Sequence, residues 1–343
     1  MLTLKVNAAK SYSVTIAGDL SAAKSVCRPL FKGEKIGVVA DDITAKLYFE
    51  KVKAVFDGKK VFLYTIKHGE KSKNIKNYNK ILNKLAKDGF TREDGIVTLG
   101  GGVAGDLGAF VASTYMRGIT LAAFPTSLLS MVDSSIGGKT AVDLKAGKNL
   151  CGTFYQPSAV YVNLEFLKTL PEKEIRNGLG EIIKYTYISP EFKKKYSGGK
   201  IADITEQLIY DCLKIKADIV EKDELESGER KLLNFGHTFG HAIEKVSGYK
   251  LPHGICVVKG IKYALILSKK FYNKDGEELK EFLKEAKSLG INPDCEYETD
   301  KLLEAIKSDK KRKGDEISFI TSDKTGTARI ENLSVSKLGE YVK

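Results

Sequence analysis

The 343-residue sequence has no tryptophan, only three methionines and seven prolines, and five cysteines without a Cys-x-x-Cys pair. An odd set of scattered cysteines argues against a disulfide framework and against a metal site built on thiolates. No apolar run approaches the roughly 20 residues of a membrane-spanning helix, and the N-terminus lacks an apolar signal segment. These absences predict a cytoplasmic protein whose cysteines are small buried residues.

Arginine is also scarce, although the chain is basic. The 56 basic and 44 acidic residues leave a formal charge of +12, and only seven of the basic residues are arginine. Because the lysines are scattered over expected helix faces, a nucleic-acid partner is not indicated, and a small acidic substrate accounts for the charge equally well. A basic RNA-binding or scaffold protein remains the non-enzymatic alternative.

The length and the pattern of apolar runs predict two domains. Short apolar runs alternate with amphipathic segments up to about residue 125, which is typical of a parallel sheet covered by helices. The expected strands are 35–40, 61–66, 95–99 and 119–124. From about residue 175 the composition becomes helical, ending near a strand at 317–320. The fold class is therefore α/β, with a Rossmann-like domain at 1–175 and a mostly α-helical domain at 176–343.

A glycine cluster, Gly100 to Asp106, follows the strand at 95–99 and satisfies G-x-G-x-x-G. Such a turn lets the backbone approach a pyrophosphate at the start of a helix, here expected over 107–115. No acidic residue follows at the usual distance for a ribose contact. Asp41, at the end of the strand 35–40, is the natural choice for that contact. The alternative for Asp41 is to cap the helix that follows.

The stretch 131–157 is polar and rich in glycine. Gly138, Lys139 and Thr140 invite a P-loop interpretation, but the first glycine of that motif would fall at position 133, which is Asp. Lysines held by a glycine-rich backbone suit an anionic substrate. A solvated loop is the alternative.

Three of the four histidines lie between residues 226 and 253. His237 and His241 are four apart in an expected helix over 232–244, so both imidazoles can reach one site. His253 follows in Leu-Pro-His-Gly, where proline and glycine mark a loop or a helix start. A catalytic zinc site takes three protein ligands from His and Asp or Glu, so one histidine can do chemistry if a carboxylate completes the set. Glu181 is the candidate. Alternatively, these are ordinary core or surface histidines.

Together these motifs resemble the 3-dehydroquinate synthase family. The resemblance runs in order from about residue 35 to residue 321, and the segments that carry it are Gly100–Asp106, Met131–Thr140, Gly147–Asn149, Gly180–Tyr185 and Asn234–His241. It implies an NAD domain, a helical metal domain and a homodimer. It also implies conversion of 3-deoxy-D-arabino-heptulosonate 7-phosphate to 3-dehydroquinate and phosphate, a step of aromatic amino-acid biosynthesis.

The resemblance also implies roles for individual residues. The metal ligands, for Zn²⁺ or Co²⁺, would be Glu181, His237 and His253. The residues of the NAD site would be Asp41, Gly69, Glu70, Lys71, Ser72, Lys73, Gly102, Val103, Ala104, Gly105, Asp106, Thr126, Ser127, Lys139, Lys148, Phe166, Leu167, Lys168 and Thr169. The catalytic and substrate-binding residues would be Asp133, Lys139, Asn149, Lys184, Lys216, Glu226, Arg230, Asn234, His241 and, across the dimer, Arg117. Either Lys310 or Lys311 would add charge.

The implied chemistry agrees with a cationic pocket beside a metal. Oxidation of the C5 alcohol acidifies the neighbouring proton, phosphate leaves, the same cofactor restores the alcohol, and an aldol step closes the ring. Two rival enzymes share the pattern: a metal-dependent polyol dehydrogenase, which would release its NADH, and another sugar phosphate cyclase. Two departures from the family pattern, Ser127 and the loop 143–146, affect no position on which the chemistry depends.

Overall fold

The computed structural model describes residues 1–307, 316–323 and 326–342, which form two compact units. Unit 1 comprises Met1–Pro171 and Thr205–Glu224, and unit 2 comprises Glu172–Ile204 and Leu225–Lys343. The sequence predicts one boundary near residue 175, whereas the chain passes between the units three times. The reason is helix α7 (Glu206–Lys222), which packs on the first two strands of unit 1.

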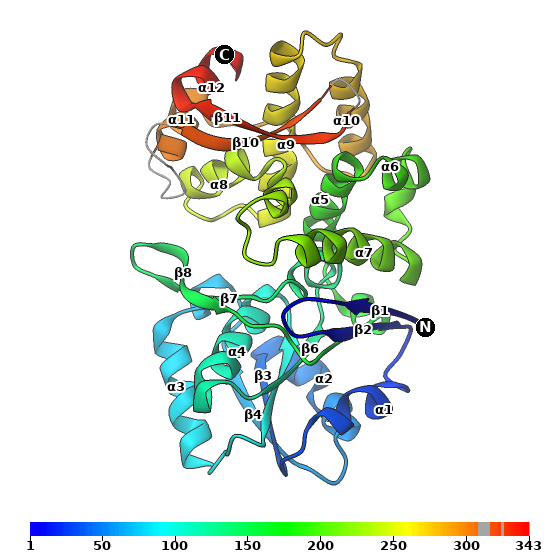
Figure 1. The fold of residues 1–343 in the computed structure, drawn as a ribbon, viewed down its shortest axis with the longest axis vertical. Coiled ribbons are helices and arrows are strands. Elements are labelled where there is room, and N and C mark those ends of the chain that lie inside the picture. The colour runs from blue at the N-terminus through cyan, green and yellow to red at the C-terminus, as the bar shows by residue number, and fades with distance from the viewer. Residues whose placement is uncertain (308–315, 324–325, 343) are drawn as a thin grey trace. The chain divides into compact units, whose positions relative to one another are not determined.

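A seven-stranded sheet, in the order β1-β2-β9-β6-β5-β3-β4, forms the centre of unit 1 (Figure 1). Only the β1–β2 pair is antiparallel. The expected strands at 35–40, 61–66, 95–99 and 119–124 are confirmed as β3 to β6, whereas β1, β2 and β9 were not predicted. The strands are β1 Leu2–Val6, β2 Tyr12–Ala17, β3 Lys35–Asp41, β4 Lys60–Ile66, β5 Gly95–Gly100, β6 Thr120–Pro125 and β9 Ala159–Asn163.

Helices cover both faces of this sheet, which explains why the central strands are almost wholly apolar. On one face, Ile81 of α3 and Leu107 of α4 pack in a core with Ile96 of β5. On the other, the Phe124 ring lies 6.3 Å from that of Phe56 and 5.7 Å from that of Tyr161. The helices are α1 Ala23–Cys27, α2 Asp42–Val55, α3 Ile75–Lys87, α4 Gly102–Thr114 and α7, with short turns η1 Arg28–Leu30, η2 Glu70–Ser72, η3 Tyr115–Arg117, η4 Ser130–Ser134 and η5 Leu164–Thr169.

The strand order places a topological switch between β3 and β5. From β3 the chain continues to β4 on one side, and from β5 it continues to β6 on the other. In open α/β sheets, ligands bind at the carboxyl ends of the strands that flank such a switch. Asp41 ends β3 and Gly100 ends β5. The glycine cluster therefore lies where this architecture places a ligand.

In unit 1, one sequence-based helix boundary was wrong, and so was the alternative of a solvated loop at 131–157. Helix α4 begins at Gly102, inside the glycine cluster rather than after it, and Gly108 lets it lie against β5, because a Cβ there would come within 2.6 Å of Thr98. The stretch 131–157 is not a plain loop. It holds η4 and an antiparallel hairpin of β7 (Lys139–Leu144) and β8 (Gly147–Phe154), whose largely polar, half-exposed strands give no alternating apolar signal.

Unit 2 is mostly helical, as predicted, and α9 is its central element, in contact with α5, α8, α10 and α12. Figure 1 shows the β10–β11 hairpin as orange and red arrows among these helices. The predicted strand 317–320 lies in β10, while β11 was not predicted. The elements are α5 Glu172–Ile188, α6 Pro190–Tyr196, η6 Lys200–Ala202, η7 Glu229–Asn234, α8 His237–Val246, α9 His253–Phe271, α10 Glu277–Ser288, α11 Thr299–Lys307, β10 Glu316–Ser322, β11 Ala328–Ser334 and α12 Val335–Val342.

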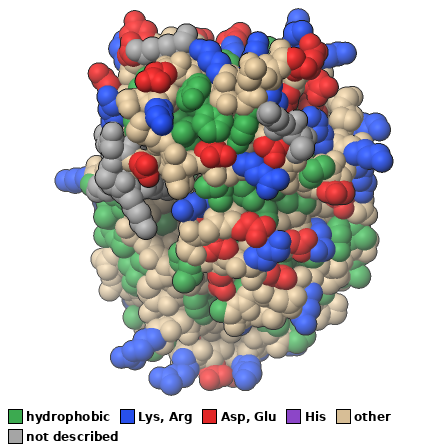
Figure 2. Space-filling view, turned by 45° about the horizontal axis from the view of Figure 1, so that its top comes forward, with side chains coloured by type: hydrophobic (Ala, Val, Ile, Leu, Met, Phe, Trp, Pro, Cys, Tyr) green, Lys and Arg blue, Asp and Glu red, His purple; other side chains and the backbone are tan. Residues whose placement is uncertain are grey.

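Two further expectations concern membranes and surface charge. Among the helices of the described residues, none combines the length and the apolar character needed to cross a membrane. On the face shown in Figure 2, Lys and Arg side chains are mixed with Asp and Glu side chains. Among the described residues on that face, no basic stripe of the kind an RNA-binding protein needs is visible. Lys310 and Lys311 lie outside the described residues.

Candidate active site

Three helices of unit 2 bring Glu181, His237 and His253 together. Glu181 lies in the middle of α5, whereas His237 and His253 are the first residues of α8 and α9. The expected helix over 232–244 therefore starts later than predicted, because Gly236, with φ of 80°, separates η7 from α8. His237 and His241 still share one face of α8, as predicted, with ring centroids 5.3 Å apart.

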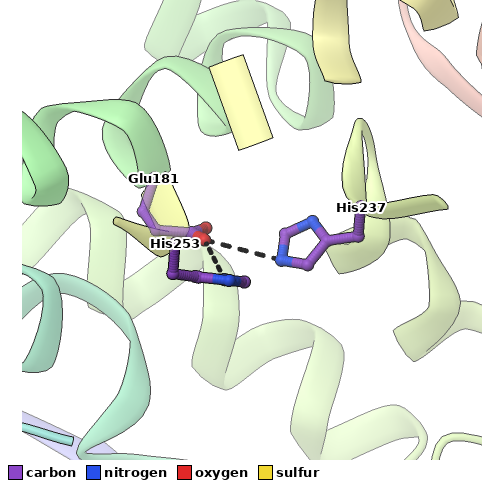
Figure 3. Close-up of side chains that lie close together, drawn as sticks. All are labelled: Glu181, His237 and His253. Atoms are coloured by element: carbon purple, nitrogen blue, oxygen red, sulfur yellow. Dashed lines mark ion pairs between the residues drawn. The ribbon is translucent and has the colours of Figure 1, made fainter. Parts of the chain in front are cut away.

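The donor atoms of these three residues converge (Figure 3). Glu181 Oε1 lies 3.0 Å from His253 Nε2 and 3.5 Å from His237 Nε2. Donors that bind zinc tetrahedrally at about 2.0–2.1 Å are roughly 3.3 Å apart, so the observed separations match such a site. Glu181 is fully buried, yet neither of its carboxylate oxygens accepts a well-aligned hydrogen bond from the described residues. A buried carboxylate in this state fits a cation ligand.

The electrostatics of this cluster follow from burial and from Lys184. Burial raises the pKa of Glu181, but Lys184, whose Nζ lies 2.6 Å from Oε2, and His237 outweigh it and hold the pKa well below its usual range. Burial lowers the pKa of His237, which favours the neutral imidazole that binds metals. Burial also lowers the pKa of His253, but hydrogen bonds and charges from Glu181 and Glu244 raise it to about 10.

His241 lies beside the three donors rather than among them. Its ring centroid is 5.9 Å from that of His253, and it belongs to a second converging group with Glu244 and His253. Glu244 was not singled out from the sequence. Its spacing, three residues after His241 and seven after His237, places it on the same face of α8. That spacing is the one signal that could have indicated it.

Unit 2 also holds several of the predicted substrate-binding residues. The Arg230 and Lys184 side chains are almost completely buried, with 2% and 1% of their surfaces exposed. Buried cations of this kind need an anionic or polar partner. Asn234 Nδ2 donates a 2.7 Å hydrogen bond to Glu226 Oε1, so these two predicted residues are coupled.

In unit 1, the predicted residues Asp133 and Lys216 also contact each other. Lys216 Nζ donates to the Asp133 carbonyl oxygen at 2.8 Å and lies 3.0 Å from its carboxylate. Lys139 begins β7 with an exposed side chain. Both lysines therefore belong to the same unit as the glycine cluster, in line with an anion site near the expected cofactor.

Strained backbone marks several predicted site residues. Among the described residues, positive φ angles occur at six non-glycine positions: Met116 (50°), Arg117 (67°), Asn149 (54°), Glu226 (61°), Tyr249 (59°) and Asn273 (53°). Non-glycine residues in this region cost about 1–3 kcal/mol each and cluster at functional sites. Three of the six, Arg117, Asn149 and Glu226, were predicted as site residues.

The N-terminus of α4 fits a pyrophosphate. Gly101 is its N-cap and no side chain accepts from the first turn, so among the described residues these N–H groups have no side-chain cap. A Cβ on Gly105 would meet no atom within 4 Å, and one on Gly102 would meet only Ser134 Oγ at 3.8 Å. The surface over the glycine turn is therefore open to an anionic ligand.

Asp41 caps the N-terminus of α2, which was the alternative to a ribose contact. Its carboxylate accepts from the backbone N–H of Ile43 and Thr44, both at 2.9 Å, and from Thr44 Oγ1 at 2.9 Å. Its Oδ2 also lies near Gly100, since a Cβ there would be 3.4 Å away. Asp41 therefore caps α2 while lying beside the switch point.

The segment 69–73 forms an ionic cluster with the hairpin. Lys73 Nζ lies 3.1 Å from both Asp106 Oδ2 and Glu70 Oε1, and Lys148 Nζ lies 3.7 Å from Glu70. Burial lowers the pKa of Lys73, but the carboxylates of Asp106 and Glu70 outweigh it and raise the pKa overall. A pocket of about 340 Å³ is lined here by Glu70, Lys73, Asp143 and neighbouring residues.

The remaining predicted cofactor residues differ in accessibility. Thr126 is buried and donates its N–H to the Gly100 carbonyl, and Ser127 is half-buried beside Gly101. Phe166 is buried against Tyr48, with ring centroids 4.4 Å apart, whereas Lys168 and Thr169 are exposed. The Phe166 side chain is therefore not accessible to a ligand.

Comparisons with known proteins agree with this geometry. The N-terminal family model of 3-dehydroquinate synthase matches residues 63–177, and the C-terminal model matches residues 178–312. The 3-dehydroquinate synthase of Clostridium acetobutylicum is 42% identical over 348 aligned residues, covering 97% of this chain and 96% of that protein. The chain belongs to the 3-dehydroquinate synthase family. It is an enzyme with 3-dehydroquinate synthase activity, a carbon–oxygen lyase, which decides against the polyol dehydrogenase that the sequence left open.

Solved structures share the fold. The structure of 2-deoxy-scyllo-inosose synthase with carbaglucose-6-phosphate, NAD⁺ and Co²⁺ matches with a TM-score of 0.88 and 21% identity over 99% of both chains. The 2-epi-5-epi-valiolone synthase of Streptomyces hygroscopicus subsp. jinggangensis 5008, with NAD⁺ and Zn²⁺ bound, matches with a TM-score of 0.86 and 23% identity over 97% of this chain and 96% of that one. These cyclases are less similar in sequence than the family relatives.

Proposed function

We propose that this family member converts 3-deoxy-D-arabino-heptulosonate 7-phosphate into 3-dehydroquinate and phosphate, using NAD and a divalent metal, zinc or cobalt. This is the second step of the shikimate pathway. The observation that carries the proposal is the convergence of Glu181, His237 and His253, with donor separations of 3.0 and 3.5 Å around a buried carboxylate. The NAD⁺ and metal ions bound in the two solved cyclases support it.

Glu181, His237 and His253 would hold the metal, with His241 beside them as a catalytic residue. When bound, the metal supplies a Lewis acid that lowers the pKa of a substrate alcohol and polarises the derived ketone. Lys184, buried against Glu181, keeps that carboxylate ionised and so ready to act as a ligand. Burial favours the neutral state of His237, and a neutral imidazole can bind a metal.

The cofactor site proposed for NAD surrounds the switch point of unit 1. When bound, NAD would supply reversible hydride transfer at the substrate alcohol, with no net consumption of the cofactor. The open first turn of α4, from Gly102 to Asp106, would bind the pyrophosphate through backbone N–H groups. Asp41 would bind the ribose through the carboxylate oxygen that also accepts from Thr44. The other residues proposed for this site are Gly69, Glu70, Lys71, Ser72, Lys73, Thr126, Ser127, Lys139, Lys148 and Phe166 to Thr169.

Cationic side chains would bind the phosphate and carboxylate of the substrate. Arg230 and Lys184 are buried and offer desolvated positive charge, which strengthens an ionic hydrogen bond. Lys216 is oriented by its contacts to Asp133. Glu226, coupled to Asn234, and His241 are the proposed catalytic residues with carboxylate and imidazole groups. Asp133, Lys139 and Asn149 complete the proposed substrate site.

The proposal includes a homodimer in which Arg117 of one protomer reaches the site of its partner. Arg117 is exposed, and the positive φ angles of Met116 and Arg117 are a strained backbone of the kind found at functional sites. Sedimentation analysis tests the assembly: a single species with the mass of one chain would contradict it.

The decisive experiment tests whether NAD is regenerated in each turnover. With the heptulosonate phosphate in large excess over NAD, one phosphate should be released for each substrate, with no lasting rise in NADH absorbance. Glycerol should give neither product. If NADH accumulates in proportion to turnover, or if phosphate release stops after one equivalent of NAD, the proposed use of the cofactor is wrong.

A further inference from the structure

The two ring nitrogens of His253 face two different carboxylates. Nε2 lies 3.0 Å from Glu181 Oε1, inside the proposed metal site. Nδ1 lies 3.4 Å from Glu244 Oε2, on the other side of the ring. Only the first of these contacts belongs to the ligand set. The second leaves a buried acidic side chain without a role in the proposed function.

Glu244 is too deeply buried to be an incidental neighbour. Only 7% of its side chain is exposed, and a buried carboxylate is costly unless a hydrogen-bond donor faces it. It lies on α8, two turns after His237, so the helix that contributes one proposed ligand also contacts the ring of another. Ser247 Oγ bonds to the Glu244 backbone carbonyl at 2.8 Å and so fixes the end of that turn.

The backbone of His253 is held separately from its ring. Asn177 Oδ1 of α5 accepts a 2.7 Å hydrogen bond from the Gly254 N–H, which caps the start of α9. This contact fixes where the His253 backbone lies, but it does not set the rotation of the imidazole. A third of the His253 side chain is exposed, so packing alone does not fix the ring either.

We infer that Glu244 is a positioning residue, which accepts the Nδ1 proton of His253 in a hydrogen bond and so presents the Nε2 lone pair to the metal. An imidazole has one proton to place when it is neutral, and an acceptor at Nδ1 decides the tautomer. Carboxylates in this outer position orient metal-binding histidines and raise their basicity, and losing them costs about 10- to 100-fold in metal affinity. The inference rests on the proposed metal site.

The other role open to Glu244 is as a ligand itself, since His241, Glu244 and His253 also converge. A second dication there would share the His253 ring with the first. Two such ions would bring four positive charges, and buried Lys184 would add a fifth. Within the two groups, only the carboxylates of Glu181 and Glu244 would balance them. Such an excess of buried positive charge is strongly unfavourable, so the positioning role is favoured.

The test measures metal affinity and stoichiometry in the full-length protein. Metal-free protein is titrated with Zn²⁺ against a chromophoric chelator for wild type, Glu244→Gln and Glu244→Leu. The matched control is Glu285→Gln, the same change at a partly buried glutamate of α10 whose neighbours include Tyr187 and Lys193. We expect Glu244→Leu to bind zinc about 10- to 100-fold more weakly. Glu244→Gln, which keeps an acceptor oxygen, should lose less, and the control should be unchanged.

A further readout separates positioning from mere structural support. Co²⁺-loaded Glu244→Gln should show altered visible absorption bands. If Glu244→Leu does not fold, the Gln variant still decides.

Each remaining outcome has a definite meaning. Wild-type zinc affinity in both Glu244 variants overturns the positioning role. Two ions per chain in wild type and one in the variants would make Glu244 a ligand, which also overturns it. Retention of zinc by His253→Ala would instead overturn the proposed metal site on which the inference rests.

Discussion

Gly180 of α5 lies directly against Gly254 of α9, so closely that a Cβ atom on Gly180 would come within 2.3 Å of the Gly254 carbonyl oxygen. The next residue after Gly180 is Glu181, and the residue before Gly254 is His253. Two of the three converging donors are therefore brought together by the absence of side chains where these helices cross.

This contact predicts that Gly180→Ala damages both stability and the metal site. The added methyl group meets backbone, which cannot move aside as a flexible side chain can, so the free energy of unfolding should fall by about 3 kcal/mol. Urea unfolding and zinc titration measure the two effects. Gly18→Ala is the control, because its Cβ would meet only Glu206 Oε1 at 3.7 Å and the change should stay within about 0.5 kcal/mol. Equal unfolding free energies would refute the crowding argument.

Removing any of the three proposed ligands should remove the metal. A site with three protein ligands loses its geometry with any one of them, so Glu181→Gln, His237→Ala and His253→Ala should each fall from about one bound metal ion per chain to nearly none. His241→Ala should keep the metal and lose activity. Metal analysis of the purified variants decides this. Loss of metal in His241→Ala comparable to that in His237→Ala would make His241 a ligand.

Arg230→Met should weaken the binding of an inert phosphonate analogue of the substrate. Because Arg230 is only 2% exposed, the loss of its charge from a desolvated anion site should cost about 3 kcal/mol, on the order of 100-fold in Kd. Lys139→Met should act in the same direction but less strongly, since Lys139 is exposed. Calorimetric titration measures both, with the exposed Arg92→Met as control. Unchanged affinity in Arg230→Met would assign Arg230 a purely structural role.

Replacing Glu285 by Gln should increase the stability of the folded protein, and the size of the increase should depend on pH. Burial raises its pKa, Lys193 counters this only in part, and its Oε1 is buried without a hydrogen bond among the described residues. A folded-state pKa above the unfolded value means that the charged form is disfavoured in the folded protein. The free-energy cost of the Glu285 charge is absent below the pKa of the unfolded state. It grows as the pH rises from that pKa and is complete above the pKa of the folded state.

Glu285→Gln should therefore raise the free energy of unfolding at pH 7 by on the order of 1 kcal/mol. The gain should shrink towards zero near pH 4. Urea unfolding at both values measures it, and Glu281→Gln, at a side chain that is 67% exposed, should show little change. A gain of the same size at both pH values would mean that the charge is not its cause.

The parts predicted from the sequence were those with a strong local pattern. The spacing of His237 and His241 depends on neighbouring residues only, and both lie on one face of α8 as predicted. The glycine turn follows β5 as predicted, but α4 begins inside it. Glu244 was missed because its spacing places it on the histidine face of α8 without showing whether it is buried there. The β7–β8 hairpin was missed because neither strand alternates: the middle of β7 is buried at three consecutive residues, and β8 is mostly exposed. Strand β11 was missed because its apolar residues are few.

The place of α7 could not be predicted for a different reason. Its apolar face, with Leu208, Ile209 and Leu213 buried, shows that the helix packs on something but not on what. Only the tertiary structure assigns it to the β1–β2 edge of the sheet. Pairings between segments more than a hundred residues apart leave no periodic trace in the sequence.

The return of the chain to unit 1 bears on how the protein emerges from the ribosome. When Pro171 has been synthesised, all seven strands of the sheet exist, but α7, which packs on β1 and β2, does not. Before α7 has been synthesised, α5 and α6 of the other unit have been made, and α5 still lacks α9, on which it packs. The nascent chain therefore carries two incomplete cores at once, which makes it a candidate for chaperone binding until translation has passed α9.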